Sequence, residues 1–199
     1  MKIGIYGGSF DPVHNGHVNA ALTFKEELSL DKIIIIPAYQ PPHKKGLALT
    51  PSEHRMNMCN IAFGSLEGFE VSDIEIKRGD EGYMVDTIKE LREIYPDDEF
   101  YLLIGGDMLL SFQRWYAWSK ITDEAIIAVA ERNWEDSSAI EGEAAILRSY
   151  GAEVRIVPID VKEISSTSVR ETVRRADDIS SMVPKGVDEY IWDNYLYYN

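Results

Sequence analysis

The sequence predicts one α/β domain built on a doubly wound parallel sheet, and two observations support this. Short apolar runs alternate along the chain with longer stretches of helical spacing, the pattern of a parallel sheet that helices cover on both faces. No internal repeat, low-complexity tract or proline-rich linker divides the 199 residues. We therefore expect a single domain over 1–199, with a helical C-terminal part from about residue 165.

The first elements have clear signals. The apolar run 2–6 leads through a glycine turn into 16–28, whose apolar residues recur near one helical face. The run 33–36 consists of four isoleucines, as expected for a strand buried on both faces, and Pro37 ends it. Thr50-Pro51-Ser52-Glu53 has the pattern of a capping box with proline at the first helical position, and it predicts a helix to about Gly64.

The rest of the chain continues the alternation. Further strands are predicted at 69–76, 100–104, 125–130 and 154–157. Further helices are predicted at 85–95, 107–118, 139–149, 168–175 and 187–195. In such Rossmann-like sheets ligands bind beyond the carboxyl ends of the strands, where the strand order reverses. Functional residues are therefore expected in the segments that follow the strands.

Composition limits the kind of protein. The formal net charge of −14 argues against general binding to nucleic acid, but a cleft with a few cations can still hold a small nucleotide. Cys59 is the single cysteine and has helical spacing from Met56, so we expect a core residue in a reducing, cytoplasmic setting. No stretch approaches the ~20 apolar residues of a membrane helix, and the first residues lack a signal-peptide core. We expect a soluble protein.

A phosphate site is predicted after the first strand. Gly7 and Gly8 lack side chains, so their backbone N–H groups can approach an anion, and the helix that begins near Gly16 directs its positive end to the same place. His14 and His17 stand at the head of this helix, where both can donate to bound phosphates. Taken singly, these features also fit an ordinary turn with solvated or capping histidines. Zinc is disfavoured because the usual i, i+4 spacing and a third ligand are not evident.

Residues 7–17, here called the signature segment, read GGSFDPVHNGH and resemble the G-G-x-F-D-P-x-H-x-G-H motif of the nucleotidyltransferase superfamily. The resemblance implies that His14 and His17 stabilise the pentacoordinate α-phosphate of ATP as pyrophosphate leaves, with no covalent intermediate. It also implies ATP contacts from Gly7, Gly8, Ser9, Phe10, His14 and His17.

A second phosphate-binding segment lies near the C-terminus. Residues 164–170 read ISSTSVR and offer several hydroxyls and N–H groups close to Arg170, a fixed cation. Serines before a helix are ordinarily caps. The run resembles the superfamily motif I-S-S-T-x-x-R, which implies contacts from Ser165, Ser166, Thr167 and Arg170 to the β- and γ-phosphates, on the side opposite the histidines.

The acceptor is suggested by further resemblances, to the bacterial nicotinate-nucleotide adenylyltransferase family, over nearly the whole chain. Residues 37–44 read PAYQPPHK and match the family loop P-x-x-x-P-P-H-K. The match implies that rigid prolines hold His43 and Lys44, and that Lys44 meets the acceptor phosphate as a point charge. A solvated turn is the alternative.

Two segments after later strands also fit this family. Residues 104–107 read IGGD and resemble I-G-x-D, which implies adenine contacts from the backbone of Ile104 and Gly105 and a ribose contact from Asp107. Asp107 also suits a helix cap. Residues 115–118 read WYAW and resemble W-x-x-W, which implies that the pyridine ring stacks on Trp115. Trp118 is expected nearer the core.

Further residues are weaker candidates. Arg132 follows a strand and is either a phosphate contact or simply solvated, and the pair His54-Arg55 is expected to be structural. Where the family has Y-T-x-D-T, this chain reads YMVDT over 83–87, so a hydroxyl is missing at Met84. Backbone N–H groups at Met84 and Tyr116 can still hold a carboxylate, and an amide would bind them more weakly.

The resemblance thus implies adenylyl transfer from ATP to nicotinate mononucleotide, giving deamido-NAD and pyrophosphate, with Mg²⁺ on ATP and no separate protein metal site. Nicotinamide mononucleotide and phosphopantetheine remain alternative acceptors, although the phosphopantetheine enzymes typically have threonine in place of His14 and a shorter chain. A non-catalytic nucleotide-binding regulator is disfavoured by the intact His14, His17, Lys44 and Arg170. The aromatic stretch 190–198 fits either the core or another subunit of a homo-oligomer.

Overall fold

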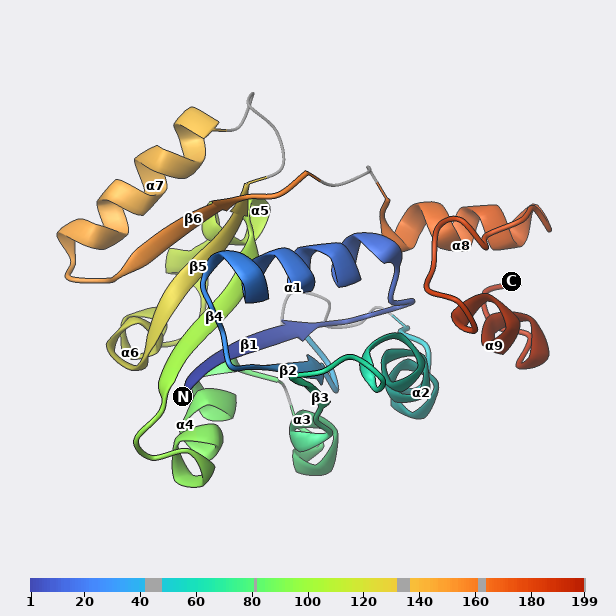
Figure 1. Ribbon diagram of the computed structural model, residues 1–199, viewed down its shortest axis with the longest axis horizontal. Coiled ribbons are helices and arrows are strands. Elements are labelled where there is room, and N and C mark those ends of the chain that lie inside the picture. The colour runs from blue at the N-terminus through green and yellow to red at the C-terminus, as the bar shows by residue number, and fades with distance from the viewer. Residues whose placement is uncertain (42–47, 81, 132–136, 161–163, 199) are drawn as a thin grey trace.

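The computed structural model describes residues 1–41, 48–80, 82–131, 137–160 and 164–198 (Figure 1). Within them an all-parallel sheet of six strands has the order β3-β2-β1-β4-β5-β6. The order reverses between β1 and β4, which confirms the doubly wound α/β fold. The strands are β1 (Lys2–Gly8), β2 (Lys32–Pro37), β3 (Phe69–Val71), β4 (Glu99–Gly105), β5 (Ala125–Glu131) and β6 (Val154–Pro158).

Helices cover both faces of the sheet. Figure 1 shows α1 on one side of the central strands, with α3 and α4 on the other, and α2, α8 and α9 grouped at one end. In the described part of the chain no helix is long and apolar enough to cross a membrane. The helices are α1 (Asn15–Glu27), α2 (Ser52–Phe63), α3 (Ile74–Arg78), α4 (Met84–Ile94), α5 (Gly106–Leu109), a 3-10 turn (Phe112–Arg114), α6 (Trp118–Glu124), α7 (Ser137–Ser149), α8 (Ser166–Arg174) and α9 (Val187–Asp193).

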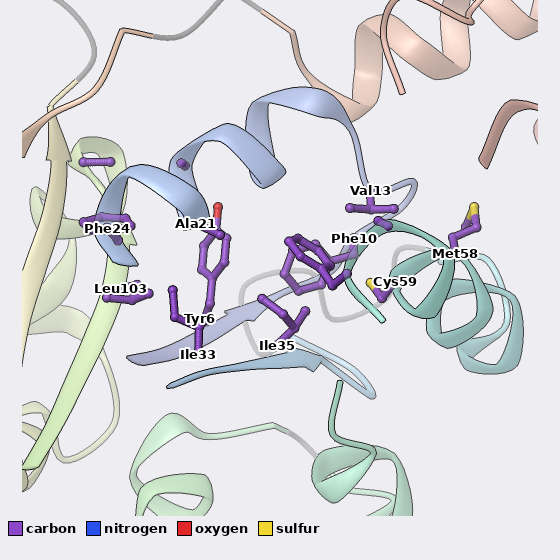
Figure 2. Close-up of a cluster of buried hydrophobic side chains, with 14 of the residues drawn as sticks. Tyr6, Phe10, Val13, Ala21, Phe24, Ile33, Ile35, Met58, Cys59 and Leu103 are labelled. Atoms are coloured by element: carbon purple, nitrogen blue, oxygen red, sulfur yellow. The ribbon is translucent and has the colours of Figure 1, made fainter. Parts of the chain in front are cut away.

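The core has one layer on each face of the sheet. Ile33 and Ile35 pack in one layer, whereas Ile34 and Ile36 pack in the other, which explains why β2 is continuously apolar from Ile33 to Pro37. Figure 2 shows the first layer, where Phe10 and other side chains lie between the strands and helices α1 and α2. The prediction that Cys59 is a core residue is confirmed, since it is fully buried and burial raises the pKa of its thiol.

Two predicted elements are shorter than expected. The strand expected at 69–76 ends at Val71, because β3 is an edge strand that pairs with only three residues of β2, and α3 begins at Ile74. The helix expected at 107–118 is broken after α5, and Ala117 has φ 51° before α6 starts. This break allows the chain to turn inward and bury Phe112 completely.

The capping box predicted at 50–53 was also wrong. Helix α2 has Pro51 at its N-cap and no side-chain cap. Thr50 is engaged elsewhere, because its N–H donates to Oδ2 of Asp11 over 3.3 Å and its carbonyl accepts from Nε of Arg55 over 2.8 Å. Tertiary contacts with the signature segment therefore replaced a local cap.

The C-terminal stretch packs on the core of its own chain. Ile191 and Leu196 are buried in the first layer, and the Tyr190 hydroxyl lies 2.9 Å from both Nδ2 of Asn57 and Nδ1 of His54. Tyr195 and Tyr198 remain exposed. The sequence left open whether the stretch 190–198 packs on the core or on another subunit. Its buried apolar residues pack on the core.

Candidate active site

The site lies at the carboxyl ends of β1, β2 and β4, beside the reversal of strand order. Gly8 is in register with Pro37, and Ile5 with Leu102, so the ends of the three strands share one edge of the sheet. The N–H of Ala38 donates to the Gly8 carbonyl over 2.8 Å, which ties the start of the predicted acceptor loop to the signature segment. His43, Lys44 and Arg132 lie outside the described residues.

The side chain of Met84 lies directly over Gly7. A Cβ atom built at Gly7 would lie 2.8 Å from Cε of Met84, so the end of the Met84 side chain would have to shift to make room for it. Met84 opens helix α4, and Tyr83 before it packs on Tyr116 with ring centroids 5.0 Å apart. The predicted acceptor residues Met84 and Tyr116 are thus gathered beside the predicted phosphate-binding glycines.

The two histidines form one unit at the start of α1. His14 is the N-cap residue in extended conformation, and its N–H donates to Nδ1 of His17 over 3.2 Å. Because Nδ1 of His17 accepts this bond, the proton of its neutral ring resides on Nε2. The two rings stack with centroids 3.7 Å apart, and His14 is buried. The geometry leaves Nε2 of His17 as the N–H donor of that ring.

The ring of Phe10 packs against the ring of His17. The Phe10 side chain is 2% exposed and contacts the His17 ring at 5.0 Å between centroids in a T-shaped arrangement. The ring of Phe10 therefore lies in the core against His17, and the predicted ATP contact of this residue stays a prediction. The backbone of Phe10, at φ 46°, shapes the turn of the signature segment.

The two predicted phosphate-binding segments meet. The Ser166 hydroxyl donates to the Pro12 carbonyl over 2.9 Å, and Nη1 of Arg170 donates to the Asp11 carbonyl over 2.6 Å. Nη2 of Arg170 also donates to the Thr167 hydroxyl over 3.2 Å. The start of α8 is therefore fastened to the loop that leads into α1. Between them lies a cavity of about 630 Å³ whose lining includes Ser9, Ser166, Thr167 and Arg170.

Ser165 has the capping role that the sequence left open. It is the N-cap of α8, and its hydroxyl accepts from the Ser168 N–H over 3.0 Å while the Ser165 N–H donates to Oγ of Ser168 over the same distance. This capping box fixes the start of the helix. The positive end of α8 consequently faces the same region as that of α1.

The segment 104–107, which was predicted to bind adenosine, lies at the end of β4. Ile104 is buried within the strand, and Gly105 is the N-cap of α5. Asp107 does not cap this helix, so that alternative was wrong, and its side chain is exposed at the strand end. One oxygen of Asp107 lies 2.6 Å from where a Cβ of Gly105 would stand, so the carboxylate folds back over the strand end and would have to shift if residue 105 had a side chain.

The tryptophan pair differs from expectation. Trp115 and Trp118 are both half-buried and both pack against the second core layer, so Trp118 is not distinguished as the core residue. Trp115 lies beside Phe112, with centroids 5.1 Å apart, and Trp118 contacts Tyr150 at 5.6 Å. Trp115 follows the 3-10 turn, whereas Trp118 is the first residue of α6.

Arg55 joins the donor and acceptor sides, and the prediction that it is structural is confirmed. Its side chain is 1% exposed and donates to four main-chain carbonyls, two of which belong to Ser9 and Ala38. The other two are the carbonyls of Thr50 and Tyr39. Burial lowers the pKa of the Arg55 guanidinium, and the nearby Asp11 carboxylate opposes this shift. The guanidinium remains charged because its ordinary pKa is so high.

A buried carboxyl group, that of Glu75, contacts helix α4, which begins with Met84. Glu75 on α3 is 2% exposed and accepts from the Thr87 hydroxyl over 2.8 Å, and burial is the main cause that raises the pKa of its carboxyl. The folded protein therefore holds a proton that the unfolded chain releases, so stability should fall as pH rises through and above the ordinary carboxyl range.

We expect Glu75→Gln to remove this pH dependence, because the amide oxygen can still accept from Thr87 and no charge has to be buried. Urea unfolding of the wild type and the variant between pH 4 and pH 8 measures how the free energy of unfolding depends on pH. This range begins near the ordinary glutamate pKa of ~4.3 and extends above it. An equal loss of stability with rising pH in the variant would show that another group is responsible.

Comparison with known proteins agrees with this arrangement. Residues 5–172 match the family model described as Cytidylyltransferase-like. A probable nicotinate-nucleotide adenylyltransferase of Dictyoglomus thermophilum is 38% identical over 99% of this chain and 100% of its own length. One from Shewanella pealeana is 35% identical over 99% of this chain and 96% of its own.

A solved structure has the same fold. Plasmodium falciparum nicotinic acid mononucleotide adenylyltransferase, complexed with NaAD, superposes with a TM-score of 0.78 at 23% identity, over 100% of this chain and 98% of that one. The sequence matches extend over nearly the full length of this chain and of the relatives. The chain therefore belongs to the Cytidylyltransferase-like family and, within it, to the family of the probable nicotinate-nucleotide adenylyltransferases.

Proposed function

We propose that this enzyme transfers the adenylyl group of ATP to nicotinate mononucleotide, giving deamido-NAD and pyrophosphate. The observation that carries the proposal is the meeting of two phosphate-binding segments at one loop, where Ser166 and Arg170 bond to the carbonyls of Pro12 and Asp11, just before His14. The names of the relatives support the same reaction and acceptor.

In the proposed mechanism the protein positions two phosphates and stabilises charge. An oxygen of the acceptor phosphate attacks the α-phosphorus of ATP in line with the departing pyrophosphate, so one P–O bond forms as another breaks. His17 donates from Nε2 to the α-phosphate, and His14 assists from the N-cap of the same helix. The start of α8, with Ser166, Thr167 and Arg170, receives the charge that develops on pyrophosphate.

Magnesium is proposed to accompany ATP. The groups that surround the predicted phosphate site are donors such as His17, Ser166 and Arg170, which suit phosphate oxygens, whereas magnesium prefers oxygen ligands. These side chains fit an ATP whose own phosphate oxygens hold the ion. When bound, the ion would neutralise part of the phosphate charge.

The acceptor is proposed to lie beside Met84 and Trp115. The first N–H groups of α4 have no partner within the helix, and such groups favour an anion. The carboxylate of nicotinate suits them better than the amide of nicotinamide, even though Met84 lacks the hydroxyl of the family pattern. Lys44, which lies outside the described residues, is proposed to hold the acceptor phosphate.

Pyrophosphate release tests the proposal. With ATP and Mg²⁺, we expect nicotinate mononucleotide to give the highest kcat/KM, nicotinamide mononucleotide to give about one tenth or less, and phosphopantetheine to give none, because a charge-assisted contact contributes ~1.5–3 kcal/mol. Initial rates with the three acceptors, measured side by side, provide the ratios.

Three other results would contradict the proposed reaction or acceptor. Equal kcat/KM for the two pyridine nucleotides would contradict the proposed carboxylate contact. Release with phosphopantetheine alone would reassign the acceptor. No release with any of the three would favour a nucleotide-binding regulator.

A further inference from the structure

The C-terminal tail returns to the signature segment. After α9 the chain is anchored by Leu196, which is 8% exposed and whose N–H donates to the Ile191 carbonyl over 3.0 Å. The next residue, Tyr197, donates its hydroxyl to Oδ1 of Asp11 over 2.7 Å, across 186 positions of sequence. Figure 1 likewise places the C-terminus beside α8 and α9, at the end of the molecule where β1 finishes.

Asp11 is the point at which several distant segments converge. Its side chain is 6% exposed, with Oδ1 bound by Tyr197 and Oδ2 bound by the N–H of Thr50 over 3.3 Å. Its carbonyl accepts from Arg170 over 2.6 Å. Asp11 is therefore fixed from the tail, from the segment before α2 and from α8. Only two residues separate it from His14, so the position of Asp11 determines where α1 begins.

Backbone conformation at both ends of this contact is unusual. Phe10, beside Asp11, has φ 46°, and Tyr195 and Tyr197 have φ 53° and 68°. Residues other than glycine rarely adopt the left-handed region, and they stay there only where surrounding contacts hold them. The contact between Tyr197 and Asp11 joins two such segments, so each helps to hold the other.

The chemistry of the pair suits a permanent contact. Burial, and then the Asp11 carboxylate, raise the pKa of the Tyr197 phenol, so the phenol remains a donor over the range in which an enzyme would be assayed. Tyr197 also lines the cavity that contains Ser166, Thr167 and Arg170. The tail therefore shares a cavity with the start of α8, the segment proposed to receive the charge of pyrophosphate.

We propose that Tyr197 is a positioning residue that, through its hydrogen bond to Asp11, sets the place of His14 and His17 for the transition state. The inference rests on the proposed function. It requires no contact between Tyr197 and the reacting atoms. Its effect should fall on kcat, because the histidines act on charge that develops only as the reaction proceeds.

The test is Tyr197→Phe, which removes one oxygen and keeps the ring in the core. We expect kcat to fall about tenfold, with KM for ATP and for nicotinate mononucleotide within about twofold of the wild type, since a small displacement of catalytic groups is costly. The matched control is Tyr190→Phe, which also removes a C-terminal hydroxyl with two polar partners, His54 and Asn57, but none in the signature segment. Circular dichroism at the assay temperature establishes that each variant is folded.

A double-mutant cycle isolates the contact. In an Asp11→Ala background, adding Tyr197→Phe should change kcat by less than about twofold, because the contact with Asp11 is already absent and the other partner of the hydroxyl, the Thr50 side chain, lies outside the signature segment. The inference is overturned if Tyr197→Phe keeps kcat within twofold of the wild type, or if Tyr190→Phe lowers kcat equally. It is also overturned if the fold-changes in kcat caused by Asp11→Ala and Tyr197→Phe multiply in the double variant, because the two side chains would then act independently. An active wild type with an unaffected Tyr197→Phe variant refutes the inference alone. A wild type that releases no pyrophosphate refutes the proposed function, and the inference with it.

Discussion

Replacing His17 with alanine is expected to lower kcat about 10²- to 10³-fold, the loss typical of removing one preorganised donor from a developing negative charge. The reason lies in the geometry of the ring. Nδ1 accepts the N–H of His14 over 3.2 Å, so Nε2 carries the proton that the α-phosphate would receive as a hydrogen bond. Initial rates of pyrophosphate release under saturating substrates measure the effect.

His17→Asn and His17→Gln separate the two functions of the ring. Asparagine places an oxygen near the position of Nδ1, so it can keep the cap on α1 but has no donor at Nε2. Glutamine places its amide near Nε2 and loses the cap. We expect the asparagine variant to be as stable as the wild type and nearly as inactive as alanine, whereas glutamine should retain more turnover and lose about 1 kcal/mol of unfolding free energy. Near-normal turnover of His17→Asn would exclude the assigned role.

Replacing Arg55 with methionine is expected to lower the free energy of unfolding by about 3–5 kcal/mol, the cost of removing one partner from a buried charged network. Methionine fills much of the same volume, so the loss measures hydrogen bonding more than packing. Four main-chain carbonyls, those of Ser9, Ala38, Tyr39 and Thr50, would lose their donor in the interior. Urea unfolding monitored by tryptophan fluorescence gives the value.

Arg155→Met is the control for that measurement. Arg155 lies on β6, its side chain is 59% exposed, and its ion pair is with Glu153, the residue just before this strand. Such exposed pairs contribute little, so we expect a change within about 0.5 kcal/mol. A similar loss in both variants, or a loss below 1 kcal/mol in Arg55→Met, would show that the four carbonyls do not depend on Arg55.

The local sequence predicted much of the fold. Strands buried on both faces are continuously apolar, so β1, β2, β4 and β5 stand out without any knowledge of their neighbours. Helical periodicity likewise placed α1, α2, α4 and α7 within a few residues of their observed bounds. The donor half of the site was also predictable, because its residues are close together in the chain and the spacing of Gly7, His14 and His17 is itself the signal.

Predictions failed where contacts at a distance outweighed local preference. Thr50 has the pattern of a cap, yet it bonds to Asp11 and Arg55. The isoleucines of α3 have strand-like spacing, but β2 offers β3 only three paired positions, and the predicted helix over 107–118 breaks so that Phe112 can be buried. In each case the competing term is burial or a hydrogen bond whose partner is many residues away.

By itself, the sequence determined the order of the elements and the faces they bury, and it predicted the chemistry of the signature segment, because periodicity and motif spacing are properties of neighbouring residues. Only the tertiary structure decided that Met84 covers Gly7, that the Phe10 ring lies beneath His17, and that Tyr197 bonds to Asp11. These contacts depend on strand order and on how helices pack over the sheet. No local signal specifies a partner 186 positions away.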